Sequence, residues 1–209
     1  MQIPYKRMNF FNLKNFDGTT EPMPTTLVFD WNWEQFQNGD CRTIINQGGT
    51  NSGKTYSICQ CLLLWAFQNA NKTITITGQD LPQIKRDVLV EFQKVIKSSI
   101  LKKAQNGRLE SQLDYEYNKS ETAYSLQNGT RIEFVAYGDA DDAKGKRDLL
   151  YIFECNNVAF SIYKELAIRT TTKVVLCYNP TARFWAHENV IPLSDSRLII
   201  SNFQHNDYL

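Results

Sequence analysis

The chain has 209 residues, of which 42% are hydrophobic, and a formal net charge of +1 at pH 7. This length suits one α/β domain with a substantial core, and the charge excludes a uniformly basic nucleic-acid-binding surface, so any such surface must be a local patch. The five cysteines form no C-x-x-C pair, which argues against a zinc site or a disulfide framework and for reduced, buried thiols. No signal peptide or membrane-spanning run is present in the sequence, so we expect no membrane partner.

The N-terminal part is expected to divide into an arm and the start of the domain. Residues 1–25 are polar, aromatic and rich in turn-forming residues, which predicts an irregular arm ahead of a domain over residues 26–209. Leu27–Trp33 is rich in aromatic residues. These rings could stack on an adenine base or pack the arm onto the core, and we favour packing because apolar surface needs burial.

The stretch Gly48–Thr55 reads G-x-x-x-x-G-K-T, the phosphate-binding P-loop pattern. Glycines let backbone N–H groups turn inward around phosphate oxygens, a lysine charge reaches the β- and γ-phosphates, and a threonine hydroxyl can ligate Mg²⁺. The sequence predicts a buried strand over Thr43–Asn46, before the loop, and apolar residues at helical spacing over residues 56–69, after it, as a P-loop requires. The positive N-terminal end of the predicted helix would favour phosphate binding. The predicted nucleotide-binding residues are Gly48, Gly49, Thr50, Asn51, Ser52, Gly53, Lys54, Thr55 and Tyr56.

Strands alternate with helices along the rest of the chain. A strand over Thr73–Thr77 precedes a long amphipathic helix over Leu81–Leu101, and a hairpin is expected around Asn128-Gly129. Later elements are expected at residues 149–153 (strand), 161–169 (helix), 173–178 (strand) and 197–203 (strand). This alternation predicts an α/β fold with a mainly parallel central sheet flanked by helices, and with a β-hairpin insertion.

Glu154 is the leading candidate for a carboxylate beside the P-loop. Hydrolysis of a nucleotide needs Mg²⁺ and a group that orients or deprotonates the attacking water. Leu149–Phe153 is a continuous apolar run, typical of a strand buried on both faces, and Glu154 follows it. The carboxyl ends of such strands form the general ligand position of open α/β sheets, and a lone carboxylate there is costly without a function.

Several stretches of the chain follow one another in the order found in a known protein family. They are Asn46–Thr55, Leu81–Arg86, Lys144-Gly145, Glu154–Asn157, Tyr178–Pro180 and Ser201–Leu209. From about Thr26 onward the chain resembles the large terminase subunit of tailed bacteriophages, specifically its ATPase domain. The resemblance implies a RecA-like P-loop NTPase fold of the ASCE type, and a motor that hydrolyses ATP with Mg²⁺ to package double-stranded viral DNA into a prohead.

The resemblance also implies partners and further site residues. The implied partners are double-stranded DNA, the portal protein, the small terminase subunit and other copies of the chain in a ring on the prohead, in the host cell cytoplasm. Asn179 is similar to a coupling motif in which a polar side chain senses the γ-phosphate. Relatives place an arginine that acts on the neighbouring subunit near Lys144, Lys146 and Arg147, and Arg147 is the predicted trigger.

The chain also departs from the family pattern. Thr50 stands where many relatives carry an arginine, and Glu154 stands alone where the family has aspartate followed by glutamate. In the register that we favour, Glu154 is the catalytic glutamate and Phe153 replaces the Mg²⁺-side aspartate. In the other register, Glu154 is the Mg²⁺ residue and Cys155 replaces the base. Because the family's nuclease domain has no room after Leu209, we expect no nuclease activity from this chain.

Two other functions stay open on the sequence alone. One is a different DNA-dependent P-loop ATPase, such as a helicase-like enzyme, although the chain is too short for the second motor-like domain that helicases would bring. The other is a nucleotide-binding module that no longer hydrolyses ATP, which the incomplete acidic pair would explain. Steady-state ATP turnover separates this module from the two enzymes.

Overall fold

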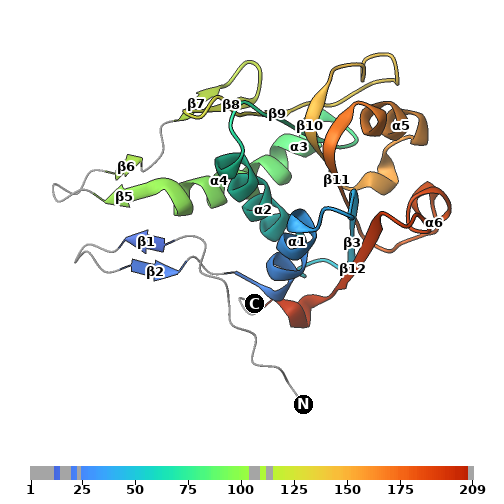
Figure 1. The fold of residues 1–209 in the computed structure, drawn as a ribbon, viewed down its shortest axis with the longest axis horizontal. Coiled ribbons are helices and arrows are strands. Elements are labelled where there is room, and N and C mark those ends of the chain that lie inside the picture. Colours follow the sequence, from blue (N-terminus) through green and yellow to red (C-terminus); the bar gives the residue numbers. More distant parts are fainter. Residues whose placement is uncertain (1–11, 15–19, 23–24, 104–108, 112–114, 207–209) are drawn as a thin grey trace.

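The centre of the fold is an eight-stranded sheet in which neighbours follow the order β12-β3-β11-β10-β4-β9-β8-β7 (Figure 1). The computed structural model describes residues 12–14, 20–22, 25–103, 109–111 and 115–206. The strands are β3 (Thr43–Gly48), β4 (Thr73–Thr77), β7 (Tyr115–Asn118), β8 (Ala123–Leu126), β9 (Arg131–Phe134), β10 (Arg147–Ile152), β11 (Thr170–Tyr178) and β12 (Ser196–Ser201). Strands from β12 to β9 pair in parallel, and β8 and β7 are antiparallel, which confirms the predicted mainly parallel sheet.

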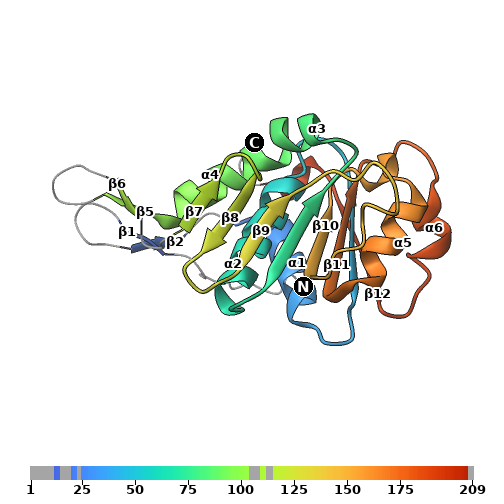
Figure 2. The same ribbon diagram turned by 90° about the horizontal axis from the view of Figure 1, so that it is seen from above.

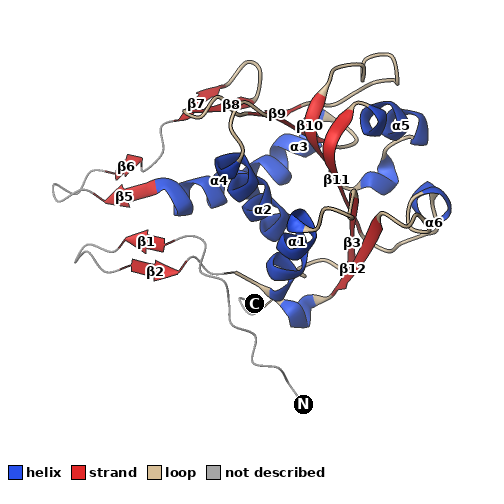
Figure 3. Ribbon diagram, in the orientation of Figure 1, coloured by secondary structure: helices blue, strands red, loops and turns tan. Residues whose placement is uncertain are grey.

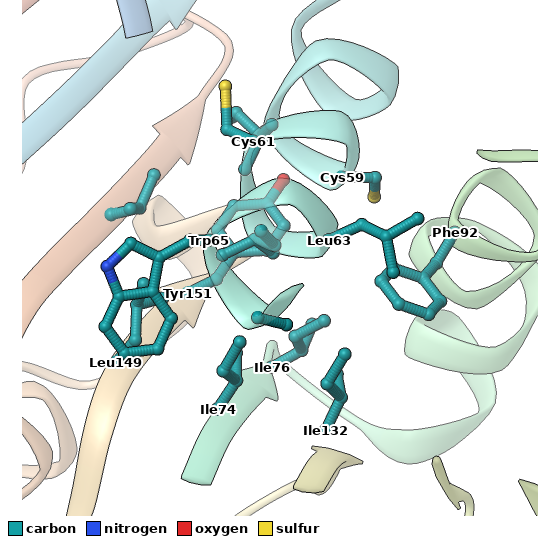
Figure 4. Close-up of a cluster of buried hydrophobic side chains, with 14 of the residues drawn as sticks. Cys59, Cys61, Leu63, Trp65, Ile74, Ile76, Phe92, Ile132, Leu149 and Tyr151 are labelled. Carbon is teal, nitrogen blue, oxygen red and sulfur yellow. The ribbon is translucent and has the colours of Figure 1, made fainter. Parts of the chain in front are cut away.

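Helices cover both faces of this sheet (Figure 2). They are α1 (Leu27–Gln37), α2 (Lys54–Gln68), α3 (Leu81–Arg86), α4 (Val88–Ile100), α5 (Phe160–Ile168) and α6 (Trp185–Asn189), with short 3-10 turns η1 (Cys155–Asn157) and η2 (Phe203–His205). Apolar side chains of α1 to α4 form one buried cluster with the sheet, part of which Figure 4 shows beneath α2. Those of α5 and α6 form a second cluster on the opposite face.

Side chains along β10 alternate between these two clusters. Leu149, Tyr151 and the following Phe153 pack in the cluster of α2, whereas Leu150 and Ile152 pack in the cluster of α5. Successive side chains of a strand point to opposite faces, so a strand covered on both faces needs apolar residues at every position. The uninterrupted apolar run of the sequence therefore has its explanation in the two helical layers.

The aromatic segment after the N-terminal arm forms α1, drawn as a helix in Figure 3. The helix begins where Thr26 Oγ1 accepts a hydrogen bond from the Phe29 N–H at 3.3 Å, an ordinary N-cap. Phe29 is 0% exposed and Trp33 is 1% exposed, with their rings stacked in the core. The packing interpretation of this segment is confirmed, and these rings are not available to an adenine base.

Two other segments differ in detail from expectation. The predicted helix over residues 81–101 is interrupted at Asp87, whose backbone angles of φ −105° and ψ −79° separate α3 from α4. Small antiparallel ladders, β1 (Asn12–Lys14) with β2 (Thr20–Pro22) and β5 (Leu101–Lys103) with β6 (Leu109–Ser111), lie outside the main sheet. Apart from β1, β2 and Thr25, the predicted arm falls outside the described residues.

The predicted hairpin forms and extends the central sheet. Strands β8 and β9 pair in antiparallel fashion around Asn128-Gly129, and β9 continues the main sheet through parallel pairing with β4. The Asn128 side chain donates to the Ala66 carbonyl at the end of α2, at 2.8 Å. The hairpin turn is therefore fixed to the helix that follows the P-loop.

Candidate nucleotide-binding site

The P-loop joins β3 to α2 at the carboxyl edge of the parallel strands. Gly53 has φ +77°, a left-handed conformation that glycine adopts without steric cost, and α2 begins directly after it at Lys54. Gly48 closes the other end, where a Cβ atom would collide with the Ser201 carbonyl oxygen of β12. The sequence therefore needs glycine at both ends of the loop, once for backbone angle and once for space.

The Lys54 side chain lies folded into its own loop. Its Nζ donates to the carbonyl oxygens of Gly48 at 2.7 Å and Gly49 at 2.8 Å, and to Ser52 Oγ at 3.1 Å. Asn179 Oδ1, from the end of β11, accepts a longer bond at 3.3 Å. Burial lowers the pKa of Lys54, because removing the ammonium from water disfavours its charged form. The charge is thus surrounded by neutral acceptors, and a phosphate oxygen would be a stronger partner.

A cavity of about 570 Å³ opens in front of this loop, within the usual range for small-molecule sites. It is lined by Thr26, Gly49, Thr50, Asn51, Ser52, Gly53, Lys54, Thr55, Tyr56, Glu91, Phe153, Glu154, Cys177, Tyr178, Asn179 and Asn206. The predicted residues from Gly49 to Tyr56 therefore meet Glu154 and Asn179 in one cavity. Gly48 lies behind it, against β12.

Glu154 stands at the tip of β10 in a left-handed conformation, with φ 48° and ψ 52°. A non-glycine residue in this region carries strain that is often found at functional sites. Its Oε2 accepts hydrogen bonds from the Gln83 side-chain amide of α3 at 2.5 Å and from the Asn157 amide at 3.3 Å. Neutral amides thus hold the carboxylate at the edge of the cavity.

The neighbours of Glu154 fit the favoured register. Phe153 lines the cavity and packs on the α2 side of the sheet, in the position that the register assigns to the missing Mg²⁺-side aspartate. Cys155 is fully buried in the cluster of α5, and burial raises the pKa of its thiol well above the ordinary value. A buried, protonated thiol on the opposite face is unsuited to the role of base that the other register requires.

Mg²⁺ is compatible with this set of donors. The Thr55 hydroxyl and the Glu154 carboxylate both border the cavity, although the described residues include no group of three or more metal-binding His, Cys, Asp or Glu side chains. Mg²⁺ usually keeps several waters and takes one or two protein ligands together with substrate phosphates. A site built from Thr55 and a nucleotide therefore fits, with Glu154 nearby.

The prediction that Arg147 acts on a neighbouring subunit is wrong for this structure. Arg147 is 3% exposed and begins β10, at the end of the strand opposite Glu154. Its guanidinium donates to the Leu166 carbonyl at 3.1 Å and to the Ala143 carbonyl at 3.3 Å. A side chain bonded to the end of α5 and a loop in its own subunit cannot project into another. Lys144 and Lys146, in the same loop, are exposed.

Residues 45–190 match a family model described as the terminase large subunit, T4likevirus-type, N-terminal. The chain belongs to this family. Its match covers more than half of the sequence and includes the P-loop, Glu154 and Asn179. No curated protein matches the sequence of this terminase chain.

Solved structures of terminases share the RecA-like fold of this terminase chain. The large terminase of a thermophilic bacteriophage superposes with a TM-score of 0.71 at 14% identity, covering 90% of this chain and 48% of that one. Its complex with ATP-γ-S gives 0.70 at 14% identity, over 89% and 47%. The ATPase domain of the Thermus phage P74-26 large terminase gives 0.54 at 12% identity, over 85% and 80%. The terminase chain thus spans about half the length of the first of these relatives.

Some residues of the terminase cavity were not predicted as site residues. Thr26 reaches the cavity from the cap of α1 and also bonds to Ser57 Oγ at 2.8 Å. Glu91 reaches it from α4, and Asn206 donates to the Asn51 carbonyl at 3.0 Å from beyond β12. No local pattern marks these residues, because their proximity to the P-loop arises only when remote elements pack.

None of the helices in the part of the chain that the structure describes has the length and apolar character needed to cross a membrane.

Proposed function

We propose that this chain hydrolyses ATP with Mg²⁺ and that the energy drives double-stranded viral DNA into a prohead, as the motor domain of a terminase large subunit. The observation that carries the proposal is the convergence of Lys54, Glu154 and Asn179 on one cavity at the carboxyl edge of a parallel sheet. The large terminase of the thermophilic bacteriophage has been solved with ADP and with ATP-γ-S, which supports a nucleotide as the ligand of the shared fold.

In the proposed reaction the P-loop binds and orients the triphosphate. The Lys54 ammonium exchanges its carbonyl partners for β- and γ-phosphate oxygens, because charged acceptors form stronger hydrogen bonds than neutral ones. The N–H groups at the start of α2 and the positive end of its dipole stabilise the same charge. Mg²⁺, when bound at Thr55, neutralises part of the phosphate charge.

Glu154 is the proposed general base. Its Oε2 accepts hydrogen bonds from the Gln83 and Asn157 side-chain amides, which hold the carboxylate at the edge of the cavity. The carboxylate accepts a proton from, or orients, a water that attacks the γ-phosphorus. To reach that water, Glu154 exchanges its bond with Gln83 for one with the water.

Asn179 is the proposed link between the phosphate and the end of β11. Its Oδ1 contacts the Lys54 ammonium in this structure. When Lys54 turns to a phosphate, Asn179 loses this partner and becomes available to the γ-phosphate. Gain and loss of that contact would shift the Asn-Pro segment with each turnover.

The proposed partners are double-stranded DNA, the portal protein, the small terminase subunit and further copies of the chain in a ring, in the host cell cytoplasm. In such a ring a cation from one subunit would complete the site of the next. With Arg147 buried, the exposed Lys144 and Lys146 of the same loop are the proposed trans-acting candidates. Lys144 forms an ion pair with Asp141 at 2.7 Å, which it would have to exchange for the phosphate.

A second candidate function is a nucleotide-binding module without hydrolysis. Phe153 favours it, because an apolar ring replaces the carboxylate expected on the Mg²⁺ side of the site. Both functions require nucleotide binding, but only the first includes ATP hydrolysis.

Phosphate release by the wild type, compared with that by Glu154→Gln, separates the two functions. The amide keeps the shape and loses the basicity, so we expect ATP binding by calorimetry to be retained and phosphate release to fall by about 10²- to 10⁴-fold. Glu188→Gln, at an exposed position of α6, serves as the matched control and should leave turnover unchanged. If the wild-type chain binds ATP and releases no phosphate even when assembled with portal and DNA, the non-hydrolysing module is the correct function.

A further inference from the structure

Tyr151 places a hydroxyl group beneath the nucleotide cavity that the proposed reaction does not use. Tyr151 is 0% exposed, in the middle of β10, with its ring packed under α2 (Figure 4). No hydrogen bond of ordinary geometry reaches this hydroxyl from the described residues. The polar groups beside it are the side chains of Thr55 and Cys177. A buried hydroxyl is costly unless it has hydrogen-bond partners, so its presence needs a reason.

The position of this hydroxyl follows from the sheet. Tyr151 pairs with Val175 of β11, and Cys177 stands two residues further along, on the same α2-facing side. Cys177 lines the cavity, as does Thr55 in the first turn of α2. The Tyr151 hydroxyl therefore lies on the inner side of Thr55, away from the opening of the cavity.

Thr55 needs a hydrogen-bond acceptor once its oxygen ligates Mg²⁺. The metal takes a lone pair of the hydroxyl and leaves its proton to be donated elsewhere, a requirement that outer partners of metal ligands usually meet. In P-loop enzymes with an acidic residue on the Mg²⁺ side, a carboxylate stands close to this hydroxyl. Here Phe153 occupies that side, and a phenyl ring cannot accept the proton as a carboxylate does.

We propose that Tyr151 is the positioning residue for the Mg²⁺ ligand Thr55: the Tyr151 oxygen accepts the Thr55 hydroxyl proton and the Tyr151 hydroxyl donates to Cys177 Sγ. The proposal rests on the nucleotide–Mg²⁺ site described above. Burial raises the pKa of Tyr151 well above its ordinary value and that of Cys177 to about 11, so both groups are neutral at physiological pH. The chain from Thr55 to Tyr151 to Cys177 gives each of the two hydroxyl protons an acceptor.

Binding of ADP with and without Mg²⁺ tests this role without relying on turnover. Tyr151→Phe removes only the hydroxyl. We expect its ADP affinity in EDTA to match that of wild type, and the extra affinity gained with Mg²⁺ to fall by about tenfold, the lower end for partners of metal ligands. Tyr124→Phe, another buried tyrosine in β8 and away from the cavity, is the matched control and should keep the full gain.

A double-mutant cycle identifies the route through Thr55. Thr55→Val should remove the same Mg²⁺ gain, and adding Tyr151→Phe to it should change nothing further. Cys177→Ala should weaken the gain in the same direction, which keeps the proposal testable if Tyr151→Phe does not fold. Full Mg²⁺ gain in both Tyr151→Phe and Cys177→Ala would overturn the proposal. Absence of ATP turnover in the wild type would instead count against the proposed ATPase function, because the ADP measurement does not depend on turnover.

Discussion

Replacing Lys54 by methionine should weaken nucleotide binding without lowering the stability of the folded chain. The methionine keeps most of the buried volume and removes an ammonium that donates to Gly48, Gly49 and Ser52. A charge-assisted hydrogen bond contributes about 1.5–3 kcal/mol, so two bonds to phosphate oxygens give a gross gain of about 3–6 kcal/mol. Because the wild type first gives up its bonds to the loop, we take about 3 kcal/mol as the net loss, or about 150-fold in Kd.

Stability should respond differently. In the absence of nucleotide, the cost of holding the Lys54 ammonium away from water among neutral oxygens offsets the hydrogen bonds that it donates, so its removal should change the melting temperature little. Since folding lowers the pKa of Lys54, the wild type should also become more stable as pH rises from this lowered pKa toward the unfolded value. The methionine variant should lack that rise.

Calorimetry with ATP-γ-S and thermal melts with and without nucleotide check these expectations. Nucleotide should raise the melting temperature of the wild type and of Lys164→Met, an exposed lysine of α5, but not that of Lys54→Met. Nucleotide affinity within threefold of wild type in Lys54→Met would refute the reasoning, as would a marked loss of stability in the absence of nucleotide.

Further predictions concern the residues around Glu154, the proposed general base, and the loop before β10. Gln83→Ala should keep ATP affinity and change the basal turnover rate by about two- to tenfold, because Glu154 loses one hydrogen bond. Arg147→Ala should lower stability by about 2–4 kcal/mol in urea unfolding, since two carbonyls lose a buried donor; an unchanged midpoint would contradict the buried role. Lys144→Ala with Lys146→Ala should keep the basal rate and abolish any acceleration on assembly, and acceleration that survives would exclude both. The purified chain should not nick plasmid DNA in Mg²⁺ or Mn²⁺.

The sequence predicts those parts of the site that are contiguous in the chain. The P-loop pattern encodes a strand, a turn that requires Gly53, and a helix start at Lys54, all within a few residues. Glu154 was predictable because an apolar run marks a strand buried on both faces, and its end marks the ligand edge of the sheet. Patterns of this kind can be recognised from neighbouring residues alone, without knowledge of the tertiary structure.

Other features depend on contacts between remote segments. Arg147 reads as part of a charged loop, yet the loop ends one residue earlier and the side chain turns inward to α5. Gln83 lies in a short helix, and its bond to Glu154 appears only when α3 packs beside β10. Asn206 reaches the P-loop from beyond β12. Composition and the periodicity of apolar residues describe one segment of the sequence at a time, so they cannot identify contacts between remote segments.

The close approach of Gly48 to Ser201 has a mechanical consequence. These residues are paired in register at the ends of β3 and β12, with less room between them than a methyl group needs. A contact between two backbones is stiff, because it has no side-chain torsions that could absorb a displacement. A sub-ångström movement of the phosphate loop would therefore reach the segment after β12 almost undiminished. The contact between Gly48 and Ser201 is thus a short, stiff link between the candidate nucleotide cavity and the segment after β12.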